Sequence, residues 1–124
     1  MTRATPLALA FLLAAAPAAA APQSGDGAYR GTVDCSAVGA SPAFRQTLAV
    51  VVREGRFALQ RGTPGEDGSE TLEGLVDLDG GVVVSGSYRA ETEKAIRYEG
   101  RVEENRILAG GKRGPRDCKM VLEG

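Results

Sequence analysis

The stretch from Leu72 to Tyr88 constrains the fold more than any other part of this chain. Two runs of alternating apolar and polar residues flank a tight Asp-Gly-Gly segment at residues 79–81. Such a segment is the strongest short-range signal for a β-hairpin, because its residues tolerate the positive φ angles of the turn. Period-two alternation gives each expected strand one inward face. These faces carry Leu72, Gly74, Val76 and Leu78 in the first strand, and Val82, Val84, Gly86 and Tyr88 in the second.

Weaker copies of this hairpin fill the rest of the chain. Further strands are expected at residues 28–35, 44–53, 56–61, 94–103, 107–112 and 116–122, with residues 90–93 as a connection. No segment shows a helical period over the length that a helix needs. About eight strands joined by short turns predict an all-β domain, an antiparallel up-and-down meander that closes into a small barrel. A β-sandwich is the alternative, and the register of residues 106–112 is left open.

The first 21 residues have the layout of a secretory signal peptide. Arg3 supplies a positive start, Leu7–Ala16 is an apolar run, and Ala18–Ala21 offers small residues for cleavage. The apolar run is too short to cross a bilayer, which needs about 20 apolar residues. We therefore expect a cleaved signal and a mature chain with no membrane span, located in the periplasm or secreted.

Cleavage near residue 21 would leave a simple domain organisation. Residues 22–27 are expected to form a disordered lead-in, and residues 28–124 a single β domain. Its two cysteines, Cys35 and Cys118, fall on the first and last strands, and an exported chain with two cysteines most simply forms one disulfide. The first and last strands of a meander are its edges, so this disulfide would bring the edges together and close the sheet.

Glycines are expected to help the sheet to curve. A glycine inside a strand costs stability, and it usually marks a bend or a close backbone approach. Five of them sit in the middle of expected strands: Gly31, Gly74, Gly86, Gly100 and Gly110.

Composition excludes several function classes. The chain has no His, which removes imidazole-based catalysis and imidazole metal ligands. Its formal net charge of −1 gives no basic field for nucleic acid. The acidic stretch Glu66–Glu70 lacks the spacing of a calcium loop, so we interpret it as a solvated loop. No motif for catalysis, metal or cofactor binding is present, and we expect neither an enzyme nor a cofactor.

A few residues remain as candidates for binding. Tyr29, Tyr88 and Tyr98 share the inward face, where they either line a cavity for a small ligand or fill the core. Arg116 is in phase with Cys118 and is expected to point inward and pair with a carboxylate. Two turn-rich segments, Ser36–Pro42 and Gly62–Ser69, are the candidate recognition loops.

The pattern of these residues resembles a group of uncharacterised small exported bacterial proteins. The shared features are the signal peptide, Gly31-x-x-x-Cys35 near the start and Arg116-x-Cys118 near the end. The resemblance implies a short β-rich domain in the periplasm or outside the cell. A second resemblance is to small exported barrel inhibitors of bacterial metalloproteases, which carry their one disulfide nearer the N-terminus.

Together these observations predict a non-enzymatic exported β-barrel. Its expected role is a binding module for a small apolar ligand or an envelope protein. The alternative is a protease inhibitor or another protein-interaction module that acts through its loops.

Overall fold

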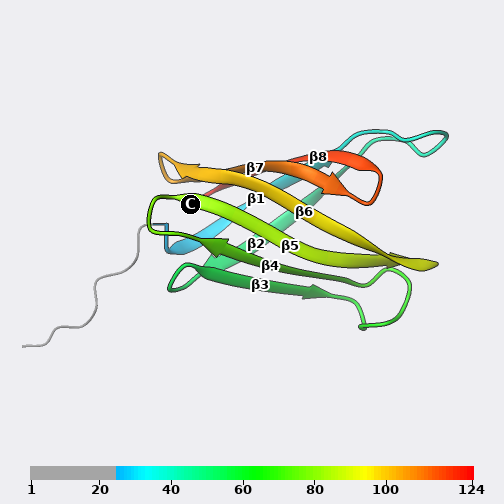
Figure 1. The fold of residues 1–124 in the computed structure, drawn as a ribbon, viewed down its shortest axis with the longest axis horizontal. Helices are drawn as coiled ribbons and strands as arrows, with labels where there is room; N and C mark the ends of the chain where they lie inside the picture. Colours follow the sequence, from blue (N-terminus) through cyan, green and yellow to red (C-terminus); the bar gives the residue numbers. More distant parts are fainter. Residues whose placement is uncertain (1–24) are drawn as a thin grey trace, which may run out of the picture.

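The computed structural model describes residues 25–124, which form eight antiparallel strands and no helix (Figure 1). The expected signal peptide lies outside the described residues, as does the lead-in up to residue 24. Gly27, placed in the lead-in by the sequence, already pairs with Val52. The strands are β1 Gly27–Cys35, β2 Phe44–Val52, β3 Arg56–Arg61, β4 Glu70–Val76, β5 Gly81–Ala90, β6 Thr92–Glu103, β7 Arg106–Arg113 and β8 Arg116–Glu123.

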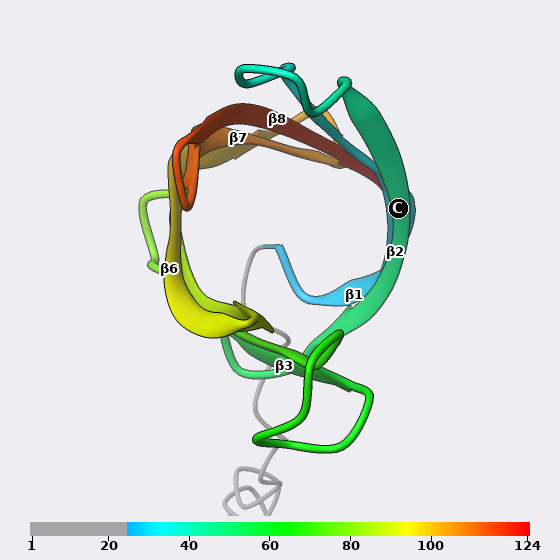
Figure 2. The same ribbon diagram turned by 90° about the vertical axis from the view of Figure 1, so that its right-hand side faces the viewer.

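The strands form one nearly closed, barrel-shaped sheet, which confirms the predicted meander (Figure 2). Their order is β2-β1-β8-β7-β6-β5-β4-β3. The first and last strands, β1 and β8, pair with each other, as expected from the Cys35–Cys118 disulfide. The sheet is open elsewhere, because β1 also pairs with β2 and β8 also pairs with β7. The edges are β2 and β3, which are consecutive in the chain. We call the boundary between β2 and β3 the seam.

The hairpin at residues 72–88 forms as predicted, with one exception. The carboxylate of Asp77 accepts hydrogen bonds from the backbone N–H groups of Asp79 (2.9 Å) and Gly81 (2.8 Å), so the turn begins at Asp77. β4 consequently ends at Val76. Leu78, which was expected on the inward face, lies in this turn and is 80% exposed.

Two further details refine the predicted strands. The connection expected at residues 90–93 is a tighter turn, because Ala90 pairs with Thr92 and Glu91 alone adopts a positive φ of 70°. In β7 the open register is settled, since Ile107 (0% exposed) and Ala109 (9% exposed) face the interior.

Several glycines sit where the barrel is too crowded for a side chain. A Cβ on Gly74 would overlap the ring of Phe57, and a Cβ on Gly31 would overlap the carbonyl oxygen of Val121 on β8. In β7 the crowded position is Gly111 rather than the expected Gly110, because Gly111 faces the backbone of Arg97 on β6. These close approaches fit the tight curvature of an eight-stranded barrel.

The inward faces of all eight strands meet in one hydrophobic cluster. Burial of each large aliphatic or aromatic side chain stabilises the fold by about 1.5–3 kcal/mol. The most deeply buried large side chains are Tyr98, Leu72, Ile107, Met120, Leu122, Val33, Val52, Val82 and Val84.

Candidate functional site

The two candidate loops lie at the same end of the barrel (Figure 2). β1 and β3 both run toward this end, so the segments that follow them, residues 36–43 and 62–69, leave the barrel there. We call it the loop end. The opposite end, the turn end, carries the short connections at residues 53–55, 77–80 and 104–105. Binding residues commonly sit on such loops above a rigid scaffold.

The first loop is fixed at its base. Cys35, the last residue of β1, pairs directly with Cys118 of β8, and the two form the predicted disulfide. Immediately beyond it, the backbone N–H of Ser36 donates to the carbonyl oxygen of Asp117 at 2.9 Å. The disulfide therefore holds the loop at the point where it leaves the sheet.

Arg116 ties down both ends of this loop, and its predicted role is wrong. Its Nη1 donates to the carbonyl oxygens of Ser36 (2.7 Å) and Pro42 (2.9 Å), not to a carboxylate. Its guanidinium also lies over the ring of Phe44, 4.8 Å from the centroid. Arg116 begins β8 at the rim of the barrel, where the loop carbonyls are closer than any interior acid.

The second loop is tied to the end of β5. The backbone N–H of Gly68 donates to the carbonyl oxygen of Arg89 at 2.8 Å, and Arg89 donates back to Ser69 at 3.0 Å. The carboxylate of Asp67 accepts from the backbone N–H of Glu91 at 3.0 Å. Both loops therefore have a defined shape above the barrel.

Glu70 is a buried hub, a carboxylate contacted by three side chains, and the sequence did not lead us to expect it. It was interpreted as part of a solvated loop, yet it is 4% exposed and begins β4 on the inward face. One carboxylate oxygen is 2.5 Å from Nη1 of Arg113, and the other accepts from Nε2 of Gln46 at 2.9 Å. Nε of Arg61 lies 3.8 Å away. Inward and outward residues alternate along β4, and extending this alternation from Leu72 back by two residues places Glu70 on the inward face.

Arg113 connects this hub to the aromatic residues of the loop end. Its guanidinium lies over the ring of Tyr88 at 4.1 Å and, more distantly, over Phe44 at 5.8 Å. A cation over an aromatic face is attracted by the ring quadrupole, more strongly where water is excluded. The side chain of Arg113 is 12% exposed, so this stack also seals the core at the loop end.

The structure brings two of the three candidate tyrosines together. Tyr98 is 1% exposed, and burial raises its pKa above the usual value, although the nearby Arg113 guanidinium opposes this shift. Tyr88 stacks on the same Arg113. Tyr29 lies at the turn end, where its hydroxyl donates to the carbonyl oxygen of Gly25 at 2.8 Å. Burial and the negative charge of Asp26 raise the pKa of Tyr29.

An open pocket of about 680 Å³ lies between the two loops. Its lining includes Phe44, Tyr88, Lys94, Arg113 and Arg116, the acidic residues Asp67 and Glu91, and further residues of the loop end. Guanidinium, ammonium and aromatic groups of this kind can bind carboxylates and planar groups. In residues 25–124, no three acidic or cysteine side chains gather as metal ligands would.

Comparisons of this chain with protein-family models, with curated proteins and with solved structures found no match. Within residues 25–124, no helix is long and apolar enough to cross a membrane.

Proposed function

We infer that this protein is a non-enzymatic binding module that works outside the cytoplasm and contacts a partner protein through its loop end. The observation that carries this proposal is the position of both long loops and the cationic, aromatic pocket at one end of the barrel. The Cys35–Cys118 disulfide supports a periplasmic or secreted location, because such bonds persist in oxidising compartments.

The fixed loops favour a protein partner. Ordering a loop on binding costs free energy, and a loop that is already held loses less. Residues 36–43 are held by the disulfide, by Arg116 and by the backbone pair between Val38 and Ser41. A protease inhibitor would present such a fixed loop to its target protease, so inhibition of a protease is one form of this proposal.

A small apolar ligand held among Tyr29, Tyr88 and Tyr98 is less well supported. Tyr29 lies at the turn end, whereas the other two surround Arg113 at the loop end. A small ligand would be better accommodated in the pocket between the loops, where a carboxylate could meet Arg116.

Site-specific photo-crosslinking in the native envelope tests the location of the contact. A photoreactive residue would replace Ala40 in the first loop or, as a matched control, Leu78 in a turn at the opposite end; both positions are exposed. We expect a defined crosslinked protein from position 40 and none from position 78. Equal crosslinking from both positions, or none from position 40, would contradict the proposal.

A further inference from the structure

The seam leaves two strand edges without a neighbour along most of their length. Near the Glu54-Gly55 turn, Arg53 and Arg56 exchange both backbone hydrogen bonds, at 2.9 and 3.0 Å. In residues 25–124, no other backbone hydrogen bond joins β2 to β3. Figure 1 shows the two strands diverging from this turn toward the loop end. The seam is therefore a wedge that is paired at its narrow end.

The position of the paired end fixes which backbone groups face into the wedge. Successive residues of a strand turn their N–H and C=O groups to opposite sides. Because Arg53 faces β3, the backbone groups of Thr47, Ala49 and Val51 face the seam as well. The contact from Nη2 of Arg61 to the carbonyl oxygen of Thr47 agrees with this orientation.

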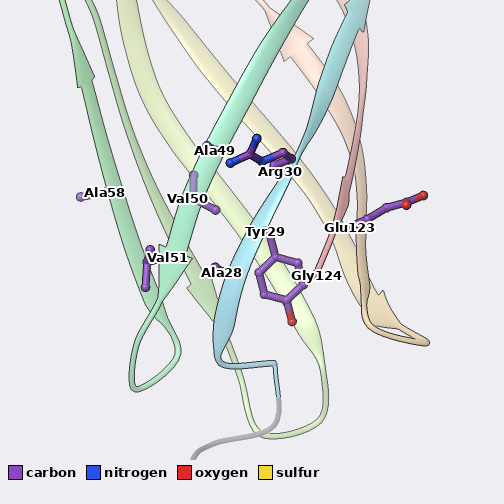
Figure 3. Close-up of a pocket in the computed structure, with 9 residues that line it drawn as sticks. All are labelled: Ala28, Tyr29, Arg30, Ala49, Val50, Val51, Ala58, Glu123 and Gly124. Carbon is purple, nitrogen blue, oxygen red and sulfur yellow. The ribbon is translucent and has the colours of Figure 1, made fainter.

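Side chains and pockets along the seam leave room for an extended chain. A pocket of about 620 Å³ is lined by Thr47, Leu48 and Ala49 of β2 and by Leu59 and Arg61 of β3. A second pocket, of about 760 Å³, continues toward the turn end and includes Val51 and Ala58 (Figure 3). Val51 is an exposed hydrophobic side chain on this edge, at 51%.

Arginines dominate the charge along the seam, although Glu54 lies in the turn between β2 and β3 and Glu123 lines the larger of the two pockets. Neither β2 nor β3 contains an acidic residue, whereas Arg45, Arg53, Arg56 and Arg61 lie in or directly beside them. Two copies of this chain joined edge to edge would bring arginines together, which disfavours self-pairing. An edge with unpaired backbone groups and flanking cations is complementary to an extended acidic segment.

We propose that the seam binds an extended acidic peptide segment of another protein, which adds as a strand along β2. Strand addition takes its affinity from main-chain hydrogen bonds and its specificity from alternate side chains. The segment would replace the Arg61 guanidinium at the carbonyl oxygen of Thr47, and its carboxylates would meet Arg53, Arg56 and the released Arg61. This site runs along the wall of the barrel and shares no lining residue with the pocket between the loops.

The probe is a blocked ten-residue peptide that alternates Glu with Thr or Val, and the readout is amide hydrogen exchange by NMR. We expect the amides of Thr47, Ala49 and Val51 to exchange at least tenfold more slowly when the peptide is added. The amides of Leu48 and Val50, which face β1, serve as internal controls and should stay protected throughout. The same peptide with N-methyl groups on the pairing residues should have no effect.

Two comparisons test whether binding depends on the charge of the peptide and of the seam. A peptide with Lys in place of Glu should bind at least tenfold more weakly. Arg53→Glu should weaken binding of the acidic peptide at least fivefold at low salt, whereas Lys119→Glu on the outer face of β8 makes the same charge change and should leave binding unchanged.

Three results would overturn the proposal. The first is no protection of the three seam amides at about 1 mM peptide, a concentration that would still detect affinities near −4 kcal/mol. The second is equal binding of the Lys and Glu peptides. The third is protection that rises with protein concentration in the absence of peptide, together with dimers in sedimentation, because a second copy would then be the occupant.

Discussion

Glu70 of β4 and Arg113 of β7 meet inside the barrel, 2.5 Å apart, although β5 and β6 separate their strands in the sheet. The pair therefore spans the interior. Gln46 and Arg61, which contact the same carboxylate, come from the two edge strands. Glu70 thus links β2, β3, β4 and β7 at the loop end, where the seam is not joined by backbone hydrogen bonds.

Removing the charge of Glu70 should be costly. In Glu70→Gln the shape is kept, but Arg113 is left as a mostly buried cation without its partner, a change that typically costs about 3–5 kcal/mol. We expect the free energy of unfolding in urea to fall by that amount. Glu99→Gln breaks an ion pair to Arg97 in which both side chains are more than half exposed, and should change stability by less than about 1 kcal/mol. Similar losses in both variants would contradict the role of Glu70 as a hub.

The disulfide should contribute a large part of the stability. The cysteines are 83 residues apart, and closing a loop of this length is worth about 4–5 kcal/mol in the chain-entropy model. The double variant Cys35→Ala, Cys118→Ala should lose about that much in urea unfolding. Reduction of the unmodified protein should produce a similar loss, and Lys119→Ala on the same strand serves as the control. A loss below about 1 kcal/mol in both cases would show that β1–β8 pairing suffices without the bond.

The buried tyrosines should make the fold sensitive to strong alkali. The folded protein raises the pKa of Tyr98 and Tyr29 above the usual 10.0, so these groups bind protons more tightly in the folded state than in the unfolded state. Their contribution is therefore fully present below pH 10 and is lost as the pH rises through the folded-state pKa. We expect stability to fall above about pH 10 and the fall to be smaller in Tyr98→Phe. An unchanged slope in that variant would contradict this assignment.

Loss of the Arg116 side chain should loosen the first loop without unfolding the barrel. Arg116→Ala removes two charge-assisted hydrogen bonds to Ser36 and Pro42, and hydrogen bonds to charged groups contribute about 1.5–3 kcal/mol when buried and less at an exposed rim. We expect faster amide exchange at Val38 and Ser41 and little change at Val84 in the core. Unchanged exchange at Val38 and Ser41 would mean that the disulfide holds the loop by itself.

The mass of the protein isolated from its native host tests export. Cleavage of the expected signal peptide would give a chain that starts at Ala21 or Pro22, and the disulfide would make it lighter than the reduced form by two hydrogens. Intact mass measured without reductant reads both at once. A full-length, reduced chain would contradict export.

Most of the fold could be predicted from the strand pattern, because period-two alternation and turn residues are local properties of the sequence. β3 was predicted to the residue, and the Cys35–Cys118 pair followed from two cysteines on terminal strands. The position of the seam did not follow, because β2 and β3 are adjacent in the sequence and joined by a tight turn, yet they separate beyond the Arg53–Arg56 pair. The expected pairing of the first and last strands was confirmed, whereas the gap between β2 and β3 was not foreseen.

The candidate site was harder to predict than the fold. The loops were found from their turn residues, and their position at one end follows from the meander, because they come after β1 and β3. Glu70 was assigned to a loop, and Arg113 lay just beyond the strand expected at residues 107–112, because charged residues beside glycines resemble solvated connections. The alternation of β4 could have placed Glu70 inside, but its pairing with Arg113, 43 residues away, has no local signal.

The pairing of β1 with β8 also has a consequence for the order of folding. In residues 25–124, every other strand pair joins neighbours in the sequence, so those hairpins can form while the rest of the chain is unstructured. β1 and β8 must instead find each other across the whole domain, which carries the largest loop-closure entropy. We therefore expect barrel closure to be the slow step, and refolding with the disulfide intact to be faster than refolding of the reduced chain.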